Sequence, residues 1–136
     1  MVSGYSGTPL AKKLNLKDGM RVWLPDMPDD VRAEIESYGL TLSEEQVPTP
    51  GLHAAHIFVR QRAIMESHLA TLRDIIDPAG QIWVSWPKKA SKVETDITED
   101  SIREVALPMG LVDIKVCAVN EIWSGLKLVI RKELRR

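Results

Sequence analysis

The sequence predicts a three-layer α/β fold, in which a mostly parallel sheet ends in an antiparallel C-terminal hairpin. Two patterns carry this prediction. Short β-branched and aromatic segments alternate with amphipathic helical segments up to residue 119, as in sheets built from right-handed crossovers. The last two apolar segments are separated only by residues 120–125, a connection that is too short for a parallel crossover. At 136 residues and 44% hydrophobic content, residues 1–136 are expected to form a single α/β domain.

The expected elements follow from periodicity and from the residues that start and stop helices. In chain order, the sequence predicts a helix over 8–14, strands over 20–24 and 40–44 on either side of a helix over 28–38, a strand over 55–59, a helix over 64–76, a strand over 82–86, a helix ending at 109, and strands over 114–119 and 126–130.

Small and polar residues set the limits of the first elements. Residues 1–7 are expected to be a flexible arm. Thr8 followed by Pro9 predicts a helix start, because Thr can cap free amides and Pro fits a first turn. Pro28, with two aspartates after it, predicts the next start, since carboxylates favour the positive end of a helix. Gly39 is typical of a helix end.

The second half follows the same rules. Residues 55–59, Ala-His-Ile-Phe-Val, form a continuous apolar run, as expected for a strand covered on both faces. Residues 77–80, Asp-Pro-Ala-Gly, are expected to stop the preceding helix. Asp96 or Thr98 can cap the last helix, and Glu99 stands three residues after Asp96, as in a capping box.

Two segments resemble class I, Rossmann-like methyltransferases. Residues 14–22, LNLKDGMRV, resemble the approach to the first strand of that fold, and residues 101–132 resemble its closing helix, strand and hairpin. The resemblance implies a methyltransferase-like sheet with strand order 2-1-3-4-6-5 in this chain's own numbering. Such a sheet is one strand–helix unit shorter than that of the full enzymes.

The cofactor motif of that family is absent from this chain. In the family, the first strand leads into an acidic residue and a glycine-rich turn, which lets the backbone approach S-adenosylmethionine. Residues 24–30 here are Leu-Pro-Asp-Met-Pro-Asp-Asp, without glycine and with two prolines that lack an amide donor. Met27 would crowd the ligand. The resemblance therefore extends to the fold, and no cofactor is expected.

A second resemblance covers most of the chain. The opening SGYSGTPLAKKL and the stretch 86–132, with WPKKASKVETD, IREVALPMGLVDIKVCAV and IWSGLKLVIRKEL, are similar to a family of small bacterial proteins of unknown function. This resemblance implies a bacterial origin and no assigned chemistry.

Composition narrows the class of protein. The single cysteine, Cys117, excludes an intramolecular disulfide and a cysteine-based zinc site. No signal peptide or membrane-spanning run is recognisable, so a cytoplasmic location is expected. Lys and Arg total 18 against 19 Asp and Glu, which disfavours nucleic acid as a partner.

The candidate site lies where the strand order reverses. Ligands of open α/β sheets bind at the carboxyl ends of the strands beside this switch, here between the first and third strands. The guanidinium groups of Arg60 and Arg62 suit phosphate or carboxylate. Lys88 and Lys89 precede a capped helix whose amides could hold an anion. Alternatively, these lysines only balance acidic residues 94–100 in a solvated loop. The expected ligand-binding residues are Asp26, Arg60, Arg62, Ser85, Trp86, Lys88 and Lys89.

Three functions are compatible with this pattern. The leading hypothesis is a non-catalytic binding or regulatory module that recognises an anionic small molecule or an acidic partner through Arg60, Lys88 and Lys89. The second is a small enzyme with Asp26 as base, which requires Asp26 not to cap a helix. The third is a structural interaction protein that forms a homodimer through the apolar edge strand 114–119.

Histidines, tryptophans and the cysteine are expected to be structural. His53, His56 and His68 are expected to be hydrogen-bonded or buried rather than metal ligands. Buried free cysteines behave as small hydrophobes, so Cys117 is not assigned a catalytic role. Trp23 and Trp83 fall inside predicted strands and are expected in the core.

Overall fold

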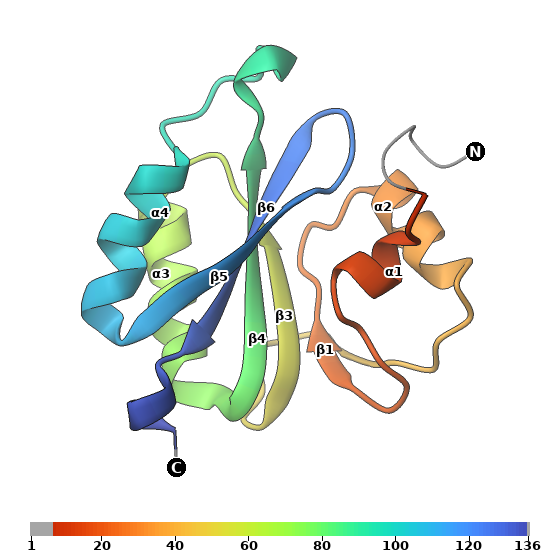
Figure 1. The fold of residues 1–136 in the computed structure, drawn as a ribbon, viewed down its shortest axis with the longest axis horizontal. Helices are drawn as coiled ribbons and strands as arrows, with labels where there is room; N and C mark the ends of the chain where they lie inside the picture. The colour runs from red at the N-terminus through yellow and green to blue at the C-terminus, as the bar shows by residue number, and fades with distance from the viewer. Residues whose placement is uncertain (1–6, 136) are drawn as a thin grey trace.

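A computed structural model describes residues 7–135. Apart from Gly7, the predicted flexible arm lies outside the described residues. Figure 1 shows a central sheet with two helices on each side, which confirms the three-layer α/β architecture. The helices are α1 (Leu10–Lys13), α2 (Asp29–Glu36), α3 (Arg62–Ile75) and α4 (Glu99–Ala106), with short 3-10 turns η1 (Lys89–Ser91), η2 (Leu107–Met109) and η3 (Lys132–Leu134).

The sheet has six strands in the order β2-β1-β3-β4-β6-β5, as predicted. Its first four strands pair in parallel, whereas β6 is antiparallel to both of its neighbours, β4 and β5. The carboxyl ends of β1, β3 and β4 therefore meet at one edge of the sheet. The strands are β1 (Arg21–Trp23), β2 (Ser43–Glu45), β3 (Leu52–Phe58), β4 (Ile76–Pro87), β5 (Leu111–Ala118) and β6 (Trp123–Ile130).

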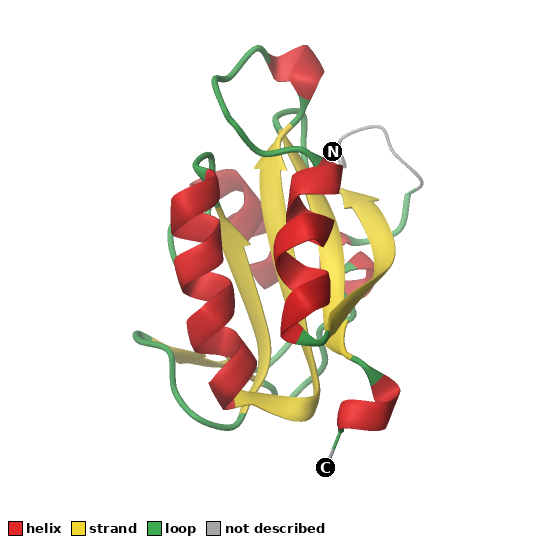
Figure 2. Cartoon of the chain, turned by 90° about the vertical axis from the view of Figure 1, so that its left-hand side faces the viewer, coloured by secondary structure: helices red, strands yellow, loops and turns green. Residues whose placement is uncertain are grey.

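Each face of the sheet carries its own hydrophobic core. One core packs Met65, Leu69 and Ile102 of α3 and α4, which lie side by side over one face (Figure 2), against the sheet. The other packs α1 and α2 against the opposite face. Trp83 belongs to this second core, and its indole Nε1 donates a hydrogen bond to the carbonyl of Leu14 at 3.1 Å. No helix in residues 7–135 is long and apolar enough to cross a bilayer.

The predicted turn at residues 77–80 is wrong in part. Helix α3 does end there, at Ile75, but the chain enters β4 immediately at Ile76. Leu52 pairs with Ile76 and Ala54 with Gln81, so the four residues form an irregularity in the strand pairing. Gly80 permits this close approach, because a Cβ there would lie 2.9 Å from the carbonyl oxygen of His53. Pairing with β3 thus overrides the local turn preference.

One predicted helix cap is wrong, and for the last helix Thr98, one of the two predicted caps, is confirmed. Helix α1 begins after Pro9 without a side-chain cap, so Thr8 does not fill the predicted role. Helix α4 is capped by Thr98, and its capping-box partner is Ser101 rather than Glu99. The amide of Ser101 donates to Thr98 Oγ1 at 3.1 Å, and the amide of Thr98 donates to Ser101 Oγ at 2.7 Å. Asp96 is left to bond elsewhere.

Candidate functional site

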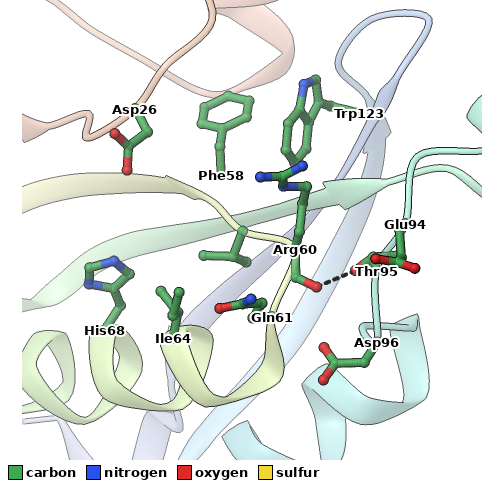
Figure 3. Close-up of a pocket in the computed structure, with 11 residues that line it drawn as sticks. Asp26, Phe58, Arg60, Gln61, Ile64, His68, Glu94, Thr95, Asp96 and Trp123 are labelled. Carbon is green, nitrogen blue, oxygen red and sulfur yellow. Dashed lines mark hydrogen bonds between the residues drawn. The ribbon is translucent and has the colours of Figure 1, made fainter.

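A cavity of about 770 Å³ opens at the carboxyl ends of β1 and β3, where the strand order reverses. The turn after β1, the end of β3, the start of α3, the β4–α4 loop and the start of β6 all contribute to its wall (Figure 3). The residues that line it are Asp26, Phe58, Val59, Arg60, Gln61, Ile64, His68, Glu94, Thr95, Asp96 and Trp123.

Asp26 occupies an unusual backbone position at this cavity. Its φ of +57° lies in the left-handed region, which Asp and Asn adopt more readily than other residues with a side chain. The next helix has Pro28 at its N-cap and no side-chain cap, so Asp26 does not cap α2. Met27 is buried in the second core. The turn therefore holds an exposed carboxylate at the end of β1, facing the cavity (Figure 3).

The β4–α4 loop is fastened to the end of β3. The carbonyl of Arg60 accepts hydrogen bonds from Thr95 Oγ1 at 2.7 Å and from the amide of Asp96 at 3.2 Å. In return, Asp96 Oδ1 accepts the amide of Arg62, the first residue of α3, at 2.7 Å. The protein's own carboxylate thus fills the anion position at the start of α3. The acidic loop is thereby held at the cavity wall.

Of the seven predicted ligand-binding residues, the structure brings two, Asp26 and Arg60, to the cavity. Arg62 instead forms ion pairs with Glu66 at 3.2 Å and Glu104 at 2.8 Å. Its side chain is thus engaged on the outer surface of α3.

The four predicted residues from β4 and the loop after it do not line the cavity either. Ser85 is fully buried, and Trp86 belongs to the first core. Lys88 follows the strand, and its amide donates to the carbonyl of Ile122 at 2.7 Å. Lys89 is exposed in η1. Because β4 continues to Pro87, it carries these lysines past the cavity mouth.

Two histidines are structural, as predicted. His56 is buried, and its Nε2 lies 2.7 Å from Ser85 Oγ. Burial lowers the pKa of His56 to about 3, so the ring is neutral at physiological pH. His53 Nδ1 accepts the amide of Arg21 at 2.8 Å. Both rings therefore hold the sheet together.

His68 departs from that prediction. It is half-buried, lines the cavity, and forms no hydrogen bond within residues 7–135. Its ring meets Trp23 edge-on at a centroid distance of 5.3 Å. Burial lowers the pKa of His68, and the charge of Asp26 raises it in part. Figure 3 shows the Asp26 carboxylate on the same side of the cavity as this ring. A neutral imidazole and a carboxylate thus share the site.

One signal in the sequence points to His68. Ile64 and His68 are four residues apart in the helix that follows β3, so they lie on one helix face beginning at the carboxyl edge of the sheet. Phe58 and Trp123 complete an aromatic wall, with ring centroids 5.2 Å apart in a T-shaped pair. Trp123 reaches this wall only through the pairing of β6 with β4, which local patterns do not specify.

The charge of the cavity is opposite to the predicted one. Its lining carries the carboxylates of Asp26, Glu94 and Asp96 against the single guanidinium of Arg60. Within residues 7–135, no group of three His, Cys, Asp or Glu side chains is placed to hold a metal ion. Burial raises the pKa of the Cys117 thiol, which makes it a poor nucleophile.

Comparison with solved structures identifies the fold. The chain is similar to an S-adenosylmethionine-dependent methyltransferase from Aquifex aeolicus, with a TM-score of 0.59 and 14% identity over 89% of this chain and 88% of that one. A second such methyltransferase, from Clostridium acetobutylicum, gives a TM-score of 0.53 and 9% identity over 89% and 87%. The chain has the class I methyltransferase fold.

Other similar structures are longer. A complex of LepI with S-adenosylmethionine matches with a TM-score of 0.55 and 12% identity, over 90% of this chain but 39% of that one. The chain thus spans less than half the length of LepI. No family model and no curated protein sequence matches the chain. The resemblance to a small bacterial family therefore stays an expectation.

The residues after β1 do not fit the cofactor of these methyltransferases. Where the family approaches S-adenosylmethionine through a glycine-rich turn, this chain places Asp26, which has a side chain in the left-handed position. Pro25 and Pro28 supply no amide donor. Met27 is buried in the second core. No step through this cofactor is derived for this chain.

Proposed function

We propose that this chain is a small enzyme that moves a proton on a small-molecule substrate, with His68 as the base. The observation that carries the proposal is a half-buried imidazole, with its pKa lowered by burial, that shares a cavity at the strand switch with the Asp26 carboxylate. A general base works best when its pKa allows the neutral form at the working pH. The likeness to methyltransferase structures supports an enzyme over a passive module.

The roles of the two groups follow from their exposure. Asp26 is exposed to water and acts through its charge rather than as the base. His68 is half-buried and accepts the proton instead. Once it is protonated, the negative charge of Asp26 stabilises the imidazolium. Asp26, predicted from the sequence as the base, thus becomes the partner of the base.

The remaining wall indicates how a substrate is held. Phe58 and Trp123 offer an apolar surface for a ring or alkyl group. Figure 3 shows the Arg60 side chain extending from the end of β3 toward Trp123, where its fork can hold a carboxylate or a developing oxyanion. The surrounding carboxylates favour a substrate that also carries a positive group.

The hypothesis of a non-catalytic module that binds an anionic ligand receives less support than the enzyme hypothesis. It depends on Lys88 and Lys89, which do not line the cavity, and the lining carboxylates outnumber the guanidinium. Anions would thus meet a net negative site. Only Arg60 of the three expected anion-binding cations remains available there.

A thermal-shift screen tests the proposal. The probes are amino acids, nucleosides, S-adenosylmethionine, its demethylated product, sugar phosphates and short keto acids. A ligand at about a hundred times its Kd stabilises the folded state by about 2.7 kcal/mol, a clear rise in Tm. The proposal expects a shift that Arg60→Ala abolishes. Its matched control, Arg62→Ala, removes a neighbouring guanidinium outside the cavity and keeps the shift.

Two outcomes would overturn the proposal. One is the absence of any shift across the probe set. The other is a shift that survives Arg60→Ala but disappears in Lys88→Ala/Lys89→Ala, which would restore the anion hypothesis. A shift from S-adenosylmethionine alone would instead assign the chain to methyl transfer.

A further inference from the structure

A second surface lies on the final hairpin, further along β6 than the cavity residue Trp123. Strand alternation places Lys127 and Val129 of β6 on the face that α1 and α2 share. Their partners on β5 are Lys115 and Val112. Lys115 is exposed, and the other three are half-buried. These four residues, with Lys13 and Lys17 beside them, are called the lysine face below.

The ammonium groups of the lysine face are held in place. Lys115 Nζ donates to the carbonyl of Lys13 at 2.8 Å, and Lys13 Nζ donates to the carbonyl of Ala118 at 3.0 Å. Lys127 Nζ donates to Asn15 Oδ1 at 2.9 Å. Each bond uses one of the three protons of an ammonium group. Because these side chains are already ordered, they lose less conformational entropy when a partner binds.

The arrangement places like charges directly opposite each other. Lys115 and Lys127 are register partners across the strand pair, and like charges in this position are destabilising. Burial lowers the pKa of Lys127, and the positive charges of Lys115 and Lys17 lower it further. Neither Lys115 nor Lys127 forms an ion pair with a carboxylate of residues 7–135. An incoming carboxylate would relieve this repulsion.

We infer that the lysine face docks an acidic segment of a partner protein. Half-buried Val112 and Val129 beside the lysines suit a partner that offers both carboxylates and apolar side chains. The charge of the whole chain, −1, lacks the basic excess of nucleic-acid binders. The partner contacts the face rather than the edge of β5, because a register shift between Asp113 and Lys115 interrupts strand addition there.

The test is an amide chemical-shift titration of the 15N-labelled full chain with a ten-residue peptide of alternating Glu and Val. A peptide with Gln in place of Glu controls for charge, and a twelve-base-pair duplex DNA tests nucleic acid. The inference expects the acidic peptide to shift amides of residues 112–117 and 125–129. Lys115→Gln/Lys127→Gln should weaken its binding about tenfold, as expected for the loss of two solvent-accessible ion pairs.

Controls separate this result from unfolding and from general charge. Lys89→Gln/Lys92→Gln removes two exposed lysines of the β4–α4 loop, outside the lysine face, and should bind like the parent chain. The Tm of Lys115→Gln/Lys127→Gln should stay close to that of the parent chain, because the variant loses both the cross-strand repulsion and the hydrogen bonds to Lys13 and Asn15. The inference is overturned by unchanged affinity in this variant, by shifts confined to other surfaces, by no binding at millimolar peptide, or by tighter binding of the DNA.

Discussion

At the scale of single residues, the proposed chemistry rests on Asp26 and His68. The two come from different elements, the turn after β1 and the middle of α3, and line one cavity because β1 and β3 are neighbours. Asp26 adopts a left-handed backbone for which glycine is better suited. Such strain concentrates at functional sites, where the surrounding structure maintains it.

This pairing predicts a change in the pKa of His68. In Asp26→Asn the negative charge that raises this pKa is removed while burial still lowers it, so the pKa of His68 should fall. The measurement is a proton NMR titration of the His68 Cε1 resonance. Asp29→Asn, which removes a nearby exposed carboxylate, should leave the resonance unchanged. A higher or unchanged pKa in Asp26→Asn would show that the two groups do not interact.

The buried pair of His56 and Ser85 predicts loss of stability in acid. The unfolded chain binds a proton at His56 with a pKa near 6.5, whereas the folded chain binds it only at about 3. Between these values the unfolded state holds more protons, so the free energy of unfolding falls as the pH falls. Over the whole window the loss reaches roughly 5 kcal/mol.

Urea unfolding at pH 7, 5 and 4 measures this loss. His56→Leu/Ser85→Ala replaces both members of the hydrogen-bonded pair by apolar groups and should remove most of the pH dependence. The single variant Ser85→Ala leaves the imidazole without its partner and should cost about 1–3 kcal/mol at pH 7. A pH dependence that is equally steep in the double variant would exclude His56 as its source.

At the scale of elements, the limits of β4 show where local patterns fail. Residues 77–80 have the composition of a turn, but pairing with β3 draws them into the sheet. Asp96 has the features of a helix cap, but it binds the amide of Arg62 instead. In both places a partner distant in sequence decides the structure. The alternation of strands and helices is less sensitive to such contacts, and it predicts the sheet order correctly.

A substitution at Gly80 tests whether residues 77–80 pack closely against β3. A methyl group there would lie 2.9 Å from the carbonyl oxygens of Asp77 and His53, neither of which can move without disturbing the strand pair. Gly80→Ala should therefore destabilise the protein by about 1–3 kcal/mol in urea unfolding. The exposed neighbour Ala79 provides the control, since Ala79→Ser should change stability by less than about 0.5 kcal/mol. Equal stability of the two variants would contradict the close approach.

At the scale of the whole molecule, the sequence predicts the architecture better than the site. The switch point between the first and third strands is where the cavity lies. Asp26 and Arg60 are predicted because they directly follow strands. His68 and Trp123 are missed, because their places depend on helix packing and on the pairing of the final hairpin.

The third hypothesis, a homodimer formed through the edge strand β5, depends on how exposed and how regular that strand is. Strand β5 does lie at the edge, and Ile114 and Val116 there are 56% and 53% exposed. Dimer formation through this strand stays a prediction. The irregular register beside Ile114 works against it, because an edge that is not straight pairs poorly with a second strand.

The central claim is that His68 moves a proton on the bound substrate. Its most direct test is solvent deuterium incorporation, followed by proton NMR, into the compound that the thermal-shift screen selects. The parent chain and the control His53→Gln should catalyse exchange, and His68→Gln should slow it by about 10²–10⁴-fold, the usual contribution of a general base. Equal exchange by His68→Gln and the parent chain would contradict the account.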